Sequence, residues 1–83
     1  MGVLDTISSA GRNRHTIILV AREKDGSVES REAEPYSYRS KDGNELFYCF
    51  DINKNGMRCF TIGNIISVEE TSNSFNPRFP VEV

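Results

Sequence analysis

Short segments of alternating apolar and polar residues cover most of the chain after residue 15. Residues 17–21 (Ile-Ile-Leu-Val-Ala) form a brief β-branched run bounded by polar residues, which is typical of a buried strand. Residues 45–52 have apolar side chains on both alternating faces, so this segment is expected near the centre of a sheet. Residues 28–36 alternate with more polar side chains, which indicates an exposed or edge strand. The pattern predicts five strands, over residues 16–23, 28–36, 45–52, 57–62 and 64–70.

Three tetrapeptides with a shared pattern separate these segments. Residues 23–26, 40–43 and 53–56 each begin with a polar residue and carry Asp or Asn third and Gly fourth. This pattern favours a type I turn whose Gly takes the left-handed position of a bulge. The first four strands are therefore expected to form consecutive hairpins. Gly63 and Asn64 predict a tight bend before the last strand, as at the corner of a small barrel.

The two ends of the chain differ from this strand pattern. Val3, Leu4 and Ile7 recur at helical spacing before Gly11, which predicts a short helix over residues 2–10 that docks on a sheet. Residues 71–83 form a tail whose prolines exclude a helix. Phe75 and Phe79 in this tail are expected to pack along the body of the domain or against a partner.

Together these elements predict a mainly β domain. One helix and five short strands joined by tight turns are the layout of a small SH3-like or Sm-like five-stranded barrel with an extended C-terminal tail. Residues 1–83 are expected to form one domain, with the barrel over residues 15–70. A small open sandwich is the alternative.

The composition of the chain excludes some classes of function but does not identify one. The chain has 83 residues and only 21 Leu, Ile, Val and Phe residues, so its core is thin. The net charge of −2 removes the general attraction for phosphate that a highly basic protein has. With no long apolar run and two separated cysteines, Cys49 and Cys59, we expect a cytoplasmic protein with free thiols.

The residue types that carry chemistry do not form a catalytic or metal-binding set. His15 is the single histidine, and it has no obvious Ser or Cys partner in sequence. Glu69 and Glu70 are adjacent on an expected strand, so they point to opposite faces and cannot act on one bond. One His and two separated Cys do not make a zinc site. We expect no enzymatic activity, no metal and no cofactor.

Three segments resemble the WYL domain family when their order and spacing are taken together. They are Glu-Pro-Tyr-Ser-Tyr at residues 34–38, Leu-Phe-Tyr-Cys-Phe-Asp at 46–51 and the run from Arg58 to Val68, followed by the closing Phe-Asn-Pro-Arg-Phe-Pro at 75–80. The resemblance implies a bacterial regulatory domain that binds a nucleotide or single-stranded nucleic acid and signals to a partner domain. Such domains usually follow a helix-turn-helix region, and only about 14 residues precede the first strand here. We therefore expect a module that acts alone or in trans.

The resemblance also implies which residues hold a ligand. Arg58 and Phe60 match the family pattern, whereas Thr61 and Asn64 stand where the family has two arginines that hold an anionic ligand. The positions of the name-giving Trp-Tyr-Leu motif fall on residues 45–47, and Tyr48 takes the aromatic role if the strand register shifts by an even number of residues.

The candidate ligand-binding residues are an arginine pair and three tyrosines. Arg58 is the first candidate, and Tyr36, Tyr38 and Tyr48 offer flat faces on which a base can stack, with Arg39 as a nearby cation. The alternative for each is ordinary strand packing or a solvated charge.

A second function is a protein-interaction or oligomerisation module that has lost the family's ligand site and uses Phe75 and Phe79 to bind a partner or another copy. In a third, purely structural interpretation, both Phe side chains pack on their own barrel.

Overall fold

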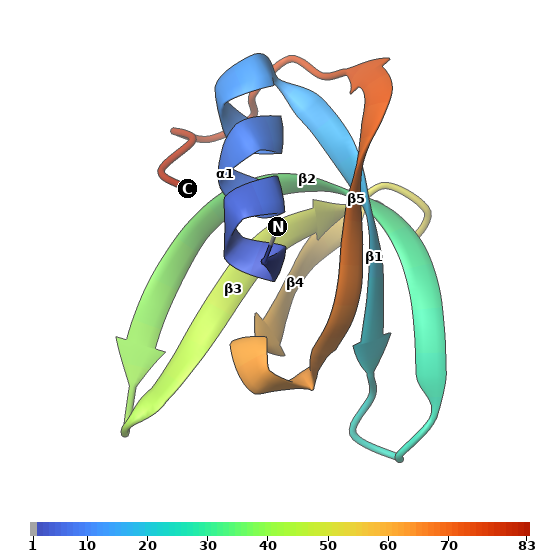
Figure 1. Ribbon diagram of the computed structural model, residues 1–83, viewed down its shortest axis with the longest axis vertical. Coiled ribbons are helices and arrows are strands. Elements are labelled where there is room, and N and C mark those ends of the chain that lie inside the picture. The colour runs from blue at the N-terminus through green and yellow to red at the C-terminus, as the bar shows by residue number, and fades with distance from the viewer. Residues whose placement is uncertain (1) are drawn as a thin grey trace.

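A computed structural model describes residues 2–83 and shows one helix and five antiparallel strands (Figure 1). The elements in chain order are α1 (Val3–Asn13), β1 (His15–Arg22), β2 (Val28–Lys41), β3 (Asn44–Asp51), β4 (Gly56–Thr61), a 3-10 turn η1 (Ile62–Asn64) and β5 (Ile65–Ser74). The strands form one sheet in the order β4-β3-β2-β1-β5, with β4 and β5 at its edges. The prediction of a mainly β, barrel-like domain is confirmed, and because all five strands belong to one sheet the open sandwich is not found.

The curved sheet and α1 enclose a small core. Helix α1 lies against β1, β2 and β5, as Figure 1 shows, and buries Ile7 and Ala10 completely. An isolated helix of 11 residues is marginal in water, so this contact stabilises it. The sheet contributes the inward-facing side chains Ile17, Leu19, Ala21, Ala33, Phe47, Cys49, Phe60 and Ile65.

Helix α1 extends three residues beyond its predicted end. It continues through Gly11 to Asn13, and Arg14 then takes the left-handed conformation (φ 58°) that ends the helix. Gly11 is buried because Val81 and Val83 of the tail pack over it, where a Cβ atom would collide with Val83. This glycine therefore provides space for the tail and does not end the helix.

Strand β2 was expected to be exposed or to lie at an edge of the sheet, and this prediction was wrong because it is the central strand and its middle residues are buried. It pairs with β1 on one side and with β3 on the other, and it extends to Lys41. Its polar pattern does not indicate exposure, because two of the charged residues, Arg31 and Glu34, are buried and paired with other residues. Strand β5 likewise continues to Ser74, so the irregular tail begins at Phe75.

The three predicted turns join strands, but only the first has the predicted form. Gly26 has φ 90°, and its N–H donates to the carbonyl of Glu23 (3.0 Å). In the second turn both Asp42 and Gly43 have positive φ, which is typical of a two-residue type I′ hairpin. In the third turn Asn55, not Gly56, takes the left-handed conformation.

Candidate functional site

Strands β3 and β4 lie between two pockets, one on each face of the sheet. Cys49 lies opposite Arg58, and Tyr48 lies opposite Cys59. Successive side chains on a strand point to opposite faces, so Arg58 and Tyr48 lie on different sides of the sheet. The structure therefore divides the predicted ligand residues between an inner and an outer site.

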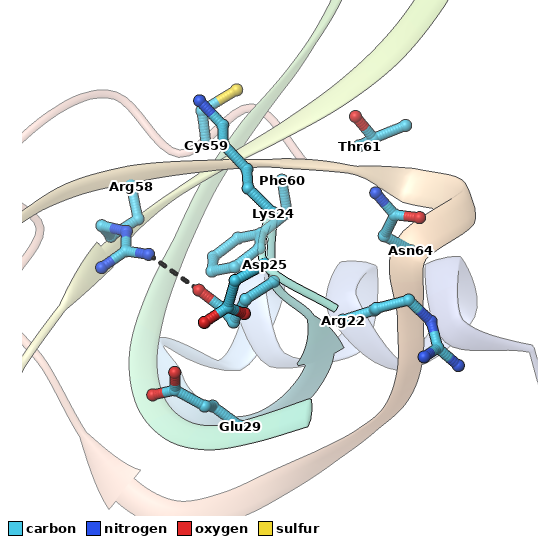
Figure 2. Close-up of a pocket in the computed structure, with 10 residues that line it drawn as sticks. Arg22, Lys24, Asp25, Glu29, Arg58, Cys59, Phe60, Thr61 and Asn64 are labelled. Carbon is cyan, nitrogen blue, oxygen red and sulfur yellow. Dashed lines mark hydrogen bonds and ion pairs between the residues drawn. The ribbon is translucent and has the colours of Figure 1, made fainter. Parts of the chain in front are cut away.

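The inner site, here called the mouth pocket, lies between β4 and the β1–β2 hairpin. It has a volume of about 490 Å³, and Figure 2 shows Arg58 and Phe60 on β4 facing the hairpin residues Lys24 and Asp25. Thr61 and Asn64, which stand where the WYL resemblance leads one to expect two arginines, line the same pocket. The remaining lining residues are Arg22, Glu23, Glu29 and Cys59. Three cations and three acids line the pocket, so it is electrically neutral as it stands.

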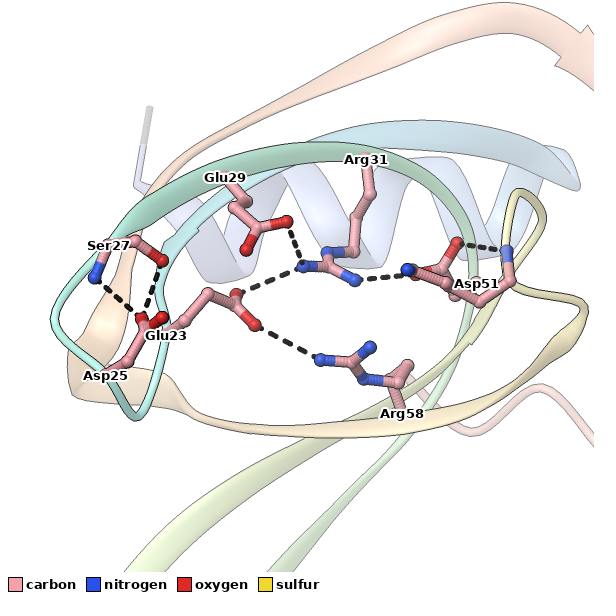
Figure 3. A network of polar contacts seen from close by, with 8 residues as sticks. Glu23, Asp25, Ser27, Glu29, Arg31, Asp51 and Arg58 are labelled. Atoms are coloured by element: carbon pink, nitrogen blue, oxygen red, sulfur yellow. Dashed lines mark hydrogen bonds and ion pairs between the residues drawn. The ribbon is translucent and has the colours of Figure 1, made fainter.

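An ion-pair network connects this pocket to the interior (Figure 3). Glu23 bridges two guanidinium groups, with Oε1 at 3.1 Å from Arg58 Nη2 and Oε2 at 3.1 Å from Arg31 Nη2. Arg31 Nη1 donates to Asp51 Oδ2 at 2.6 Å. Glu29 lies further out, 3.7 Å from Arg31. The network therefore runs from the buried Asp51 to the half-buried Arg58.

Burial and pairing act in opposite directions on the two deepest groups. Burial lowers the pKa of the Arg31 guanidinium, but the hydrogen bond to Asp51 and the nearby acidic charges outweigh it and raise the pKa. Burial likewise opposes ionisation of Asp51, yet the backbone N–H of Lys54 and the Arg31 guanidinium hold the pKa of Asp51 below its usual value. Both groups are therefore charged near neutral pH.

The ring of Phe60 separates the mouth pocket from the core. The guanidinium carbons of Arg31 and Arg58 lie 5.3 Å and 5.7 Å from its centroid, which is within cation–π range. These contacts hold both guanidinium groups beside Phe60, with Arg58 lining the pocket and Arg31 buried behind Glu23.

The outer site, here called the outer pocket, lies on the opposite face of β2, β3 and β4. It has a volume of about 540 Å³ and brings together four of the predicted residues, Tyr36, Arg39, Tyr48 and Phe79. Ser37, Met57, Pro80 and Glu82 complete its lining. Arg39 forms an exposed ion pair with Glu82 at 3.2 Å.

The C-terminal tail covers much of this outer face. The pairing register of β2 and β3 shifts between Pro35 and Ser37, and the carbonyl of Tyr36 accepts the N–H of Glu82 at 2.6 Å. Phe75 and Phe79 pack edge-on against the Tyr36 ring, with centroids 5.8 Å and 5.4 Å away. Tyr36 is consequently only 1% exposed, so the tail, rather than a ligand, covers its ring.

The hydroxyl of Tyr36 also fixes the tail. It donates to Glu34 (2.5 Å) and accepts the backbone N–H of Arg78 (2.9 Å). Arg78 itself donates to Glu34 and stacks 4.0 Å from the Phe50 centroid. Burial, together with the neighbouring Glu34, raises the pKa of Tyr36 to about 12.

Tyr38 lies apart from both pockets. Its ring packs against Phe47 at a centroid distance of 5.9 Å, beside the core, and with Leu4 and Ile62 it lines a smaller cavity near α1. Burial raises the pKa of its hydroxyl. The three tyrosines thus do not form one stacking platform.

Glu23, Arg31 and Asp51 were not predicted as site residues, although Glu23 lines the mouth pocket and connects it to the buried Arg31–Asp51 pair. A weak signal was present: Arg31 alternates with the apolar Ala33 and therefore shares its inward face. Within residues 2–83 no group of three His, Cys, Asp or Glu side chains is placed to hold a metal ion. Over the same residues, no helix is both long enough and apolar enough to cross a membrane.

Comparisons with known proteins support the fold. The structure is a small curved antiparallel sheet with one helix. It is similar to the solved structure of proteasome accessory factor B/C (PafBC) of Arthrobacter aurescens, with a TM-score of 0.77 and 21% sequence identity. The match covers 95% of this chain and 13% of that one. At this identity the likeness shows the fold alone. No family model matches the sequence, and no curated protein matches it.

Proposed function

We propose that this domain is a regulatory module that binds a nucleotide or a single-stranded nucleic acid through a phosphate group in the mouth pocket. The observation that carries the proposal is the convergence of Arg31 and Arg58, from two different strands, on the single carboxylate of Glu23. Two guanidinium groups around one anion are the arrangement that phosphate recognition uses.

The size and position of the pocket support this function. A volume of about 490 Å³ is within the range of small-molecule sites. Arg58 occupies the position that the WYL resemblance assigns to ligand binding, and Thr61 and Asn64 lie beside it. The likeness to PafBC supports a regulatory role, although the chain spans only 13% of that protein.

Fluorescence anisotropy with labelled single-stranded DNA and RNA, and with labelled AMP, tests the proposal at low salt. We expect saturable binding that Arg58→Gln weakens about tenfold, because a charge-assisted contact is lost. The dependence on salt should be shallow because few cations are available. Arg39→Gln, an exposed arginine of the outer pocket, is the matched control and should change affinity less than about twofold. The absence of binding at about 100 μM protein contradicts the proposal.

A second candidate function is protein docking or self-association through the outer pocket. It is favoured by Met57 and Phe79, which line the pocket and are 43% and 47% exposed. Light scattering on the wild type and on Met57→Lys tests it: an oligomer that the substitution dissociates supports docking. A monomer in both proteins, up to the limit of solubility, contradicts self-association.

A further inference from the structure

We propose that Glu23 is a built-in competitor for the ligand's anionic group. Its carboxylate occupies the position between Arg31 and Arg58 where a phosphate or carboxylate of the ligand would bind, so the ligand binds by displacing it. This inference rests on the proposed function and adds the regulation of the same site.

The geometry of Glu23 is that of a bound anion. Each carboxylate oxygen faces a different guanidinium at 3.1 Å, one on β2 and one on β4. The Glu23 side chain is 13% exposed, while that of Arg58 is 35% exposed. A ligand therefore reaches Arg58 from solvent first, and it contacts Arg31 only after the Glu23 carboxylate has moved aside.

Arg31 has hydrogen-bonding capacity that Glu23 does not satisfy. Among residues 2–83, buried Arg31 Nε has no hydrogen-bond partner, and Glu23 Oε2 is close to Arg31 Nη2 without hydrogen-bond alignment. Asp51 occupies only Nη1. The Nε and Nη2 atoms form one edge of the guanidinium, and two parallel N–H groups on such an edge suit an oxyanion. A phosphate can therefore make better contacts with Arg31 than Glu23 does.

The charge balance explains why displacement is required. The lining of the mouth pocket holds three cations and three acids, so it does not attract an anion while Glu23 remains in place. Withdrawal of the Glu23 carboxylate leaves Arg58 without its partner and gives the pocket one net positive charge. Glu23 therefore selects ligands with enough negative charge to compete, and it disfavours neutral ones.

The hydrogen bonds of the hairpin hold the backbone of Glu23, and those named below do not involve its side chain. The Glu23 N–H donates to the carbonyl of Ser27 (2.7 Å), and Gly26 N–H donates to the carbonyl of Glu23 (3.0 Å). Asp25 accepts hydrogen bonds from the N–H and hydroxyl of Ser27. Displacement consequently needs rotation about side-chain bonds only, and the hairpin does not have to open.

The experiment titrates the full chain with inorganic phosphate at pH 7 and constant ionic strength, and follows the arginine Nε–Hε signals by NMR. We expect Glu23→Gln to bind phosphate about tenfold more tightly than the wild type, because the competing charge is gone. Adding Arg58→Gln to this variant should abolish the gain. Glu29→Gln removes an equal charge from the same lining, 3.7 Å from Arg31, without breaking the Glu23 bridge. It therefore measures the effect of charge alone and should raise affinity clearly less than Glu23→Gln does.

A second variant of Glu23 and a second anion complete the test. Glu23→Asp keeps the charge but is too short to reach both arginines, so it should also bind phosphate more tightly and serves if Glu23→Gln fails to fold. A parallel titration with acetate distinguishes a phosphate ligand from a carboxylate ligand. Equal phosphate affinities of wild type, Glu23→Gln and Glu23→Asp overturn the inference, even if nucleotides bind. If phosphate binding follows Glu23 but no nucleotide or nucleic acid binds, the proposed function fails and the competitor role of Glu23 stands.

Discussion

The mouth pocket and the outer pocket share strand β4 yet have opposite chemistry. Arg58 and Phe60 point inward, where Glu23, Arg31 and Asp51 supply charged partners. Met57 points outward, into a site of aromatic residues that the tail partly covers. Alternate side chains of this one short strand therefore line both sites. The charged partners at the mouth pocket and the aromatic residues at the outer pocket come from other elements.

The mouth pocket and the outer pocket depend on different kinds of stabilisation. Charges buried at the mouth must be compensated group by group, because an uncompensated buried charge is costly. The outer pocket is held mainly by aromatic packing, by two hydrogen bonds of one tyrosine hydroxyl and by a single ion pair, from the half-exposed Arg78 to Glu34. Substitutions should therefore have larger effects at the mouth than at the outer pocket.

The largest expected effect is that of Arg31→Met, which leaves Asp51 as an unpaired buried charge. We expect the free energy of unfolding to fall by about 3–5 kcal/mol, measured by urea denaturation followed by circular dichroism. Arg31→Met combined with Asp51→Asn removes the stranded charge and should restore part of the loss. A loss below about 1 kcal/mol in the single variant would show that the mouth does not depend on this pair.

Tyr36→Phe should have a smaller effect at the outer face. The substitution leaves the ring packing intact but removes the hydroxyl, which donates a hydrogen bond to Glu34 and accepts one from the N–H of Arg78. We expect a loss of about 1–3 kcal/mol in the same urea experiment. Tyr48→Phe, in the same pocket but half-buried, is the control and should change stability by less than about 0.5 kcal/mol. Equal effects of both variants would contradict a special role for the Tyr36 hydroxyl.

The two regions should also lose stability at opposite ends of the pH range. The folded pKa of Asp51 is below its ordinary value of 3.8, so its contribution is complete above that pH and is lost as pH falls through the lower folded pKa. The folded pKa of Tyr36 is about 12 against 10.0, so its contribution is complete below pH 10 and is lost as pH rises towards 12. Urea denaturation across pH should show a flatter acid limb in Asp51→Asn and a flatter alkaline limb in Tyr36→Phe. An unchanged limb in either variant counts against that group's role.

The smallest effect is expected for Arg39→Ala at the rim of the outer pocket. Arg39 and Glu82 are 58% and 53% exposed, and exposed ion pairs contribute little. We expect a change in unfolding free energy of less than about 1 kcal/mol, and a thermal melt in high salt should make it smaller still. A loss above about 2 kcal/mol would indicate that this pair anchors the tail.

Short stretches of sequence were sufficient to predict that the helix, the strands and the turns between them exist. The β-branched run at residues 17–21 and the turn at residues 23–26 act over a few residues, and the structure has strand and turn there. The position of β2 was predicted wrongly because polar side chains were taken to face water. Arg31 pairs with Asp51, 20 residues further along the chain, and no local pattern records such a partner.

The candidate site was predictable only in part for the same reason. Arg58, Tyr48 and Arg39 could be selected from their residue types and from the family resemblance. Their division between two faces depends on the pairing of Cys49 with Arg58, which requires the β3–β4 register. The role of Glu23 depends on a contact with Arg58 across 35 residues, so it became visible only in three dimensions.

The contrast between the two cysteines gives the molecule an intrinsic labelling site. Cys49 is buried in the core, and burial raises its pKa to about 12, so its thiol is both inaccessible and un-ionised at neutral pH. Cys59 is exposed on β4, lines the mouth pocket and lies opposite Tyr48 of the outer pocket. A thiol-reactive fluorophore should therefore attach to Cys59 alone, without any engineered mutation. Attached there, it would report by its emission on events at either pocket.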